Sequence, residues 1–206
     1  MLKTRIAVLV SGGGTNLQAL IDAAARGENP CGEIALVIAD KPEAYALERA
    51  EKAGIPTVVV NKKESASQEE FEAQLRRALT QFDIDLIVLA GFLCILSADF
   101  TKAYPERIIN VHPSLIPSFC GKGYYGLRVH QAALDYGVKV TGATVHFVNE
   151  IPDGGKIILQ KAVAIEPGDN AQTLQKRVME LAEWQILPQA VALVSQKIQG
   201  EKNENV

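Results

Sequence analysis

The sequence predicts an α/β fold: a Rossmann-like, mostly parallel sheet flanked by helices, with antiparallel strands at its C-terminal edge and a long C-terminal helix. Short runs rich in β-branched residues, apolar on both faces, alternate with segments of helical periodicity in the first half. Such alternation is typical of parallel strands joined by right-handed helical crossovers. In the second half, two apolar runs joined by a polar turn predict antiparallel pairing.

The parallel part has five expected strands, over Arg5–Ser11, Glu33–Ala39, Thr57–Val60, Leu86–Ala90 and Arg107–Val111. Between them, apolar residues at helical spacing predict helices over Asn16–Arg26 and Tyr45–Ala53. Ser67 and Glu70 have the spacing of a capping box, which predicts the start of another helix. Ligands of a parallel sheet bind at the carboxyl ends of its strands. The loops of interest are therefore Ser11–Asn16, Gly91–Ser97 and His112–Gly126.

The C-terminal third is expected to add two strands, a long helix and a tail. The strands are predicted over Thr144–Asn149 and Ile157–Ile165. Helical periodicity runs over Leu174–Ile198, and Pro188 is expected to bend or split that helix. From Gly200 the residues are polar, which predicts a frayed tail over 200–206.

Composition and charge narrow the class of protein. A length of 206 residues predicts one domain, 1–206. The net charge of −3 argues against a nucleic-acid binder, which normally carries a basic face. The longest apolar run, Leu86–Leu96, is too short to cross a membrane. Three cysteines without metal-ligand spacing predict a reduced, cytoplasmic protein with no metal site.

The glycine cluster after the first strand, Ser11–Asn16, is predicted to bind a phosphate monoester. Glycines let backbone N–H groups approach an anion, and the following helix N-terminus adds positive potential. Leu17 stands where a dinucleotide fingerprint would place its third glycine. Asp40, after the second strand, is placed where a ribose-binding carboxylate could lie. A nicotinamide-dependent oxidoreductase therefore stays open as an alternative.

Asn110 and His112 are the strongest candidates for catalysis. Both end a buried strand, and strand alternation puts their side chains on one face at the ligand-binding edge. Histidine exchanges protons near neutral pH, and an asparagine amide donates to an oxyanion. The pair therefore suits acyl transfer. Asp153 is a candidate carboxylate partner for His112, but spacing alone favours the alternative that Asp-Gly here is a common hairpin turn.

Several motifs occur in an order that resembles the phosphoribosylglycinamide formyltransferases, folate-dependent enzymes of purine synthesis. They are Ser11–Ala19 (SGGGTNLQA), Leu89–Phe92 (LAGF), Asn110–Pro117 (NVHPSLIP), Val145–Phe147 (VHF) and Asp153–Gly155 (DGG). The resemblance extends from about residue 4 to about residue 195. Methionyl-tRNA formyltransferases and formyltetrahydrofolate hydrolases resemble the core too, but carry an additional domain, for which we expect no room in 206 residues.

The resemblance implies direct transfer of a formyl group from 10-formyltetrahydrofolate, a co-substrate, to the glycine amine of glycinamide ribonucleotide, without a metal. It makes Asn110 and His112 catalytic and Asp153 the carboxylate that raises the pKa of His112. It divides the domain into a phosphoribosyl-binding half, 1–100, and a catalytic and folate-binding half, 101–200. The implied ligands of the phosphoribosylglycinamide are Gly14, Thr15, Asn16 and Glu183. The implied folate contacts are Gln68, Leu93, Cys94, Ile95, Leu96, Asn110, Val148, Asn149 and Glu150.

The sequence departs from the family's pattern at a few positions. Cys94 stands where the family usually has an arginine, a change that a backbone contact tolerates. Gln68 stands where many members have an arginine that reaches the folate tail, so that cationic contact is missing here. Trp184 replaces a common histidine after Glu183, and Leu181–Trp184 holds one extra residue. Cys120, in the loop after the catalytic strand, is expected to be a shielded small hydrophobe.

Partners are expected to be small molecules, with no nucleic acid and no membrane, and the protein a monomer or homodimer. Two further alternatives stay open. A non-catalytic module could keep the phosphate loop alone, and the formyl group could go to another amine, such as that of an amino sugar nucleotide.

Overall fold

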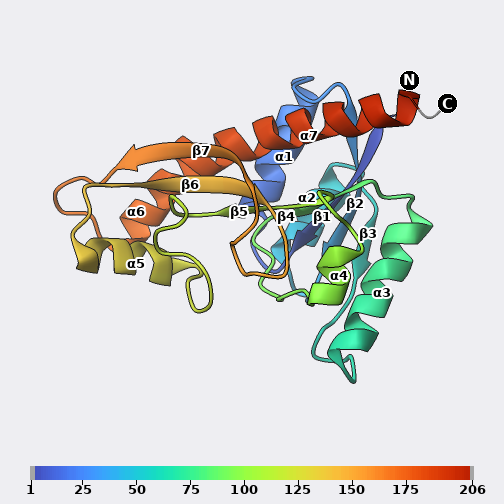
Figure 1. The fold of residues 1–206 in the computed structure, drawn as a ribbon, viewed down its shortest axis with the longest axis horizontal. Coiled ribbons are helices and arrows are strands. Elements are labelled where there is room, and N and C mark those ends of the chain that lie inside the picture. Colours follow the sequence, from blue (N-terminus) through green and yellow to red (C-terminus); the bar gives the residue numbers. More distant parts are fainter. Residues whose placement is uncertain (1–2, 205–206) are drawn as a thin grey trace.

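The computed structural model describes residues 3–204, which form a seven-stranded sheet in the order β3-β2-β1-β4-β5-β6-β7 (Figure 1). The strands are β1 (Thr4–Val10), β2 (Gly32–Ala39), β3 (Thr57–Val59), β4 (Leu86–Leu89), β5 (Ile108–His112), β6 (Val140–Phe147) and β7 (Ile157–Ala164). Strands β1 to β5 are parallel, whereas β6 and β7 pair antiparallel. The predicted fold class is confirmed.

The helices cover both faces of the sheet. They are α1 (Thr15–Ala25), α2 (Tyr45–Lys52), α3 (Gln68–Gln81), α4 (Ala98–Lys102), α5 (Leu127–Tyr136), α6 (Ala171–Val178) and α7 (Trp184–Glu204). In Figure 1, α1 and α7 lie above the sheet and α3 and α4 below it. Residues of α1, α2, α6 and α7 form one apolar layer, and those of α3 and α4 form the other. Both faces of the parallel strands are therefore buried.

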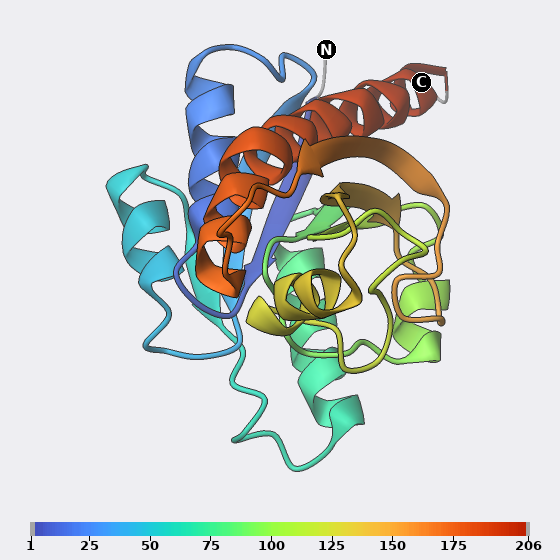
Figure 2. The ribbon, with the colours of Figure 1, turned by 90° about the vertical axis from the view of Figure 1, so that its left-hand side faces the viewer.

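Three elements differ from the sequence-based expectation. The short helix α4 starts after Ser97, whose hydroxyl accepts from the Phe100 N–H at 3.1 Å. Helix α5 follows the glycine-rich segment after β5 and was not expected either. Strand β6 begins at Val140 rather than Thr144, because its first residues continue the ladder with β7, with Val140 opposite Ala164. Figure 2 views the end of the molecule at which α5 lies.

Pro188 does not split the C-terminal helix. Pro188 lies inside α7, and the helical run is interrupted earlier, by a π-helical turn over Met179–Glu183. A π-helical turn accommodates one residue more than an α-helical turn. The extra residue predicted between Leu181 and Trp184 falls within and beside this turn. The interruption therefore lies before the proline.

The expected frayed tail is also wrong for residues 200–204, which continue α7. Lys202 Nζ lies 2.6 Å from Asp85 Oδ2, and Glu201 pairs with Arg107. These ion pairs tie the end of α7 to the beginnings of β4 and β5. Residues 205–206 lie outside the described part of the chain. In the described part, no helix is both long and apolar enough to span a bilayer.

Candidate active site

Asn110 and His112 lie at the carboxyl end of β5, on the same face of the strand, as expected. The antiparallel register places Asn110 opposite His146 and His112 opposite Thr144 of β6. His112 is 4% exposed and His146 is 1% exposed. The last parallel strand and the first antiparallel one thus bring an amide and two imidazoles together at one edge of the sheet.

Asp153 reaches this strand end from the turn between β6 and β7. Its Oδ2 lies 3.5 Å from His112 Nδ1, and its Oδ1 lies 3.6 Å from His146 Nε2. The Gly121 N–H also donates to Oδ2 at 2.8 Å. The glycine at 155 makes this turn possible, since a Cβ there would lie 1.7 Å from the carbonyl oxygen of Phe147. One carboxylate therefore faces both histidines.

The partners of His146 indicate which of its nitrogens carries the proton. Its Nδ1 lies 2.8 Å from the Phe147 carbonyl oxygen, which can only accept. The Nε2 of the neutral ring is then an acceptor, and the Asn110 Nδ2 amide donates to it at 3.2 Å. His146 thus orients the Asn110 amide. Our sequence reasoning gave His146 no role, although the VHF motif on a strand paired with β5 was the signal available.

One nitrogen of His112 likewise faces a backbone carbonyl, and its other nitrogen faces the Asp153 carboxylate. Its Nε2 lies 2.9 Å from the Phe119 carbonyl oxygen, so Nε2 carries a proton. In the neutral ring Nδ1 then turns a lone pair toward the Asp153 carboxylate. A second proton on Nδ1 converts this repulsion into an ion pair.

Burial opposes that second proton and outweighs the carboxylate. Burial lowers the pKa of His112 below its ordinary value, while Asp153 and the Phe119 carbonyl raise it without compensating. Asp153 thus raises the pKa of His112, as expected, although burial leaves the net pKa lowered. Burial also raises the pKa of Asp153, but the neighbouring His146 ring, the charge of His112 and the Gly121 amide outweigh it and leave that pKa lowered. Asp153 is therefore ionised at neutral pH.

A cavity of about 130 Å³ opens beside this cluster. Seven of the predicted folate contacts line it, namely Cys94, Ile95, Leu96, Asn110, Val148, Asn149 and Glu150. Leu93 is not among the lining residues and is 58% exposed. Gln68 is not among the lining residues either, and its amide donates to the Ile95 carbonyl at 3.1 Å. The predicted folate residues thus gather here, with Leu93 and Gln68 outside the cavity surface.

The Cys94 thiol is uncharged and forms a hydrogen bond with the Asp40 carboxylate. Its thiol donates to Asp40 Oδ2 at 3.1 Å. Burial, with the hydrogen bond and charge of Asp40, raises the pKa of Cys94 to about 12. Asp40 itself is 5% exposed, so it is shielded from the ribose that the oxidoreductase alternative would require. Burial and the nearby Asp153 likewise raise the pKa of Cys120, and both thiols stay protonated at neutral pH.

The glycine loop ends at Gly14, whose backbone adopts the left-handed conformation. Its φ is +71°, and a Cβ there would lie 2.6 Å from the Cβ of Ala46 on α2. Helix α1 begins at the next residue, Thr15, with neither a side-chain cap nor an acidic residue in its first turn. The free N–H groups and positive end of α1 therefore face the loop, as an anion site requires.

Asn16 and Glu183 meet although 167 residues separate them. The Asn16 amide donates to Glu183 Oε2 at 2.7 Å. Glu183 is the last residue of the π-helical turn, and burial raises its pKa to about 7 against the opposing effect of Asn16. The four predicted ligands of the phosphoribosylglycinamide thus lie on one loop and the helix turn packed against it. Within residues 3–204, no group of three or more His, Cys, Asp or Glu could hold a metal ion.

Comparisons with known proteins agree on one family. Residues 4–191 match the formyl transferase family model. The chain is 47% identical over 193 residues to the human trifunctional purine biosynthetic protein adenosine-3, covering 94% of this chain but only 18% of that protein. It is 44% identical over 184 residues to the phosphoribosylglycinamide formyltransferase of Haemophilus influenzae, covering 89% and 84%. The structure of glycinamide ribonucleotide transformylase 1 from Symbiobacterium toebii superposes with a TM-score of 0.88 at 40% identity, covering 95% and 89%.

Proposed function

The chain belongs to the formyl transferase family, and on that premise we propose that it transfers the formyl group of 10-formyltetrahydrofolate to the glycine amine of N1-(5-phospho-D-ribosyl)glycinamide. The reaction is a step of purine synthesis. The single observation that carries the chemistry is the meeting of Asn110, His112 and Asp153 beside the cavity at the end of β5. The identity to the Haemophilus enzyme over most of both chains supports the choice of acceptor.

The acceptor amine attacks the formyl carbon and gives a tetrahedral intermediate with a negatively charged oxygen. The Asn110 amide, held by His146, donates to that oxygen. His112 assists in its protonated form. Burial keeps the free imidazole neutral, but a negative charge forming beside it favours the cation, and Asp153 already faces Nδ1. The negative charge on the intermediate therefore favours protonation of His112, and the protonated His112 stabilises that charge in return.

Collapse of the intermediate breaks the bond between the formyl carbon and N10 of the folate. The former amine loses a proton and N10 gains one, so the reaction is balanced without a metal. We assign this proton transfer to His112, and such acid–base assistance typically contributes about 10²–10⁴ in rate. The rest of the acceleration comes from holding both substrates side by side.

The two substrates occupy the two regions described above. The phosphate lies on Gly14, Thr15 and Asn16 at the positive end of α1, and Glu183 contacts the ribose or glycinamide. The pterin lies in the cavity beside Asn110, and the absence of arginine at 68 and 94 predicts weak dependence on a polyglutamate tail. We place the enzyme in the cytoplasm, in line with its three free cysteines, as a monomer or homodimer.

A turnover assay with 10-formyl-5,8-dideazafolate and glycinamide ribonucleotide tests the proposal. We expect release of the deformylated folate that depends on the acceptor and falls at least about 100-fold in His112→Ala. Asp135→Asn, an exposed change on α5, is the matched control and keeps wild-type turnover. Release without acceptor would indicate a hydrolase, and no release would favour a binding module. Wild-type turnover in His112→Ala would refute the assigned role.

A further inference from the structure

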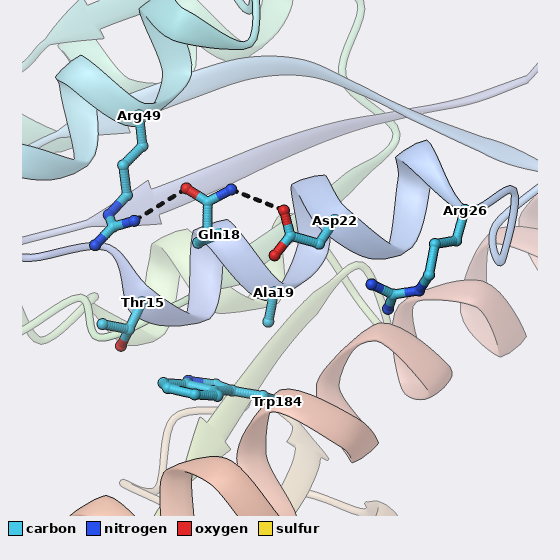
Figure 3. A pocket seen from close by; sticks show the side chains of 7 residues that line it. All are labelled: Thr15, Gln18, Ala19, Asp22, Arg26, Arg49 and Trp184. Carbon is cyan, nitrogen blue, oxygen red and sulfur yellow. Dashed lines mark hydrogen bonds between the residues drawn. The ribbon is translucent and has the colours of Figure 1, made fainter.

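A second and larger cavity, of about 320 Å³, lies along α1 next to the glycine loop. Figure 3 shows α1 on one side of it and the Trp184 ring on the other. The lining residues are Thr15, Gln18, Ala19, Asp22, Arg26, Arg49 and Trp184. Thr15 belongs to the proposed phosphate site, so this cavity and that site share a border.

Arg49 reaches the border from α2 and contacts the glycine loop directly. Its Nε donates to the Gly13 carbonyl at 2.8 Å, and its Nη1 donates to Gln18 Oε1 at 3.0 Å. The Gln18 amide is held in turn by Asp22 at 2.8 Å (Figure 3). The guanidinium also lies over the Tyr45 ring, 5.1 Å from its centroid. Arg49 is thus fixed from several sides.

These contacts leave part of the guanidinium available. Nη2 donates to no acceptor among residues 3–204. The other arginine of the cavity, Arg26, is bound to Glu28 at 2.5 Å. The loop Ser11–Asn16 contains no lysine or arginine. A phosphate monoester carries between one and two negative charges near neutral pH, which one helix end neutralises only in part.

We propose that Arg49 is the cation of the phosphate site and binds the substrate phosphate through Nη2. Its Nε acts at the same time on the loop, because it holds the Gly13 carbonyl, an acceptor that would repel an anion, away from the phosphate. Arginine suits both tasks, since its planar fork offers several donors in fixed directions. The proposal rests on the proposed function only in assuming a phosphorylated substrate.

The test compares Arg49→Met and wild type on two acceptors, glycinamide ribonucleotide and the same compound without its phosphate. Charge-assisted hydrogen bonds predict a loss of about 10- to 100-fold in kcat/KM for the phosphorylated acceptor, mainly through KM. We expect less than about threefold for the dephosphorylated one, since no phosphate contact is lost. Equal losses on both acceptors would show a merely structural role and overturn the proposal. Arg49→Lys should recover part of the loss.

Lys52→Met is the matched control, because Lys52 is on the same helix and its Nζ lies 5.6 Å from the centroid of the Tyr45 ring. It removes one positive charge nearby without touching the loop, and we expect unchanged KM. Calorimetric titration with ribose 5-phosphate keeps the two proposals separate. Weaker binding to Arg49→Met than to Lys52→Met supports the proposed contact even if the wild type transfers no formyl group. Equal binding to both would refute it.

Discussion

Replacing Asp153 by asparagine isolates the effect of one negative charge on His112. The amide has nearly the shape of the carboxylate, and its oxygen can still accept from the Gly121 N–H. What disappears is the charge 3.5 Å from His112 Nδ1. Asp153→Asn should therefore lower the pKa of His112 further below the ordinary value, since burial then acts without opposition from the carboxylate.

The geometry bounds the size of this effect. At 3.5 Å, a carboxylate and an imidazolium attract by about 1 kcal/mol at the dielectric constant of water and by about 5 kcal/mol at an effective value of about 20. A change of 1.36 kcal/mol alters a protonation equilibrium tenfold, so the proton affinity of His112 should fall at least about fivefold. Because the folded pKa lies below the unfolded one, His112 already destabilises the fold as the pH drops below about 6.5. The variant enlarges that loss.

Titration of the histidine signals by NMR measures this directly, and with three histidines in the chain the assignment is tractable. The expected result is a lower midpoint for His112 in Asp153→Asn and an unchanged one in Asp135→Asn, which removes a charge from exposed α5. A midpoint for His112 that is equal or higher in Asp153→Asn would refute the reasoning.

Three further changes test separate parts of the account. The folded pKa of Glu183, about 7, lies above the unfolded value of 4.5, so ionisation of Glu183 destabilises the fold as the pH rises between these values. In urea unfolding over that pH range, the wild type should lose up to about 3 kcal/mol of unfolding free energy relative to Glu183→Gln. Parallel pH profiles of the two proteins would contradict this. Gly14→Ala places a Cβ on a left-handed backbone and 2.6 Å from the Ala46 Cβ, and should lower the free energy of unfolding by about 2–4 kcal/mol. Gly27 has the same backbone conformation but open space around it, so Gly27→Ala should cost only about 1 kcal/mol. Asp83, just after α3, has φ +48°, so Asp83→Gly should raise the unfolding free energy by about 0.5–1 kcal/mol; a loss would show that its side chain contributes instead.

The sequence predicted those parts of the fold that depend on local pattern. Runs such as Glu33–Ala39 are apolar on both faces because helices cover both sides of the sheet. The sequence of a single strand is enough to reveal this pattern. The tail from Gly200 was misjudged because its order comes from Asp85 and Arg107, which are distant in sequence. Pro188 gave a strong local signal for a split, but the helix is interrupted before it, by the π-helical turn over Met179–Glu183.

The candidate site shows the same limit. Asn110 and His112 could be found from strand alternation, since both end one strand. Asp153 needed the family resemblance, because its approach depends on a turn. His146 was missed because its partnership with Asn110 follows from strand register, and the net pKa of His112 depends on burial, which requires the packed structure.

The central claim is that the formyl group passes directly to an amine held beside Asn110 and His112. A single-turnover reaction with donor labelled with ¹³C in the formyl group, followed by NMR, measures where that carbon goes. The account predicts that the label appears on the glycine nitrogen of the phosphoribosylglycinamide, at a rate strongly reduced in Asn110→Ala. Label found in free formate, or a rate unchanged in Asn110→Ala, would contradict it.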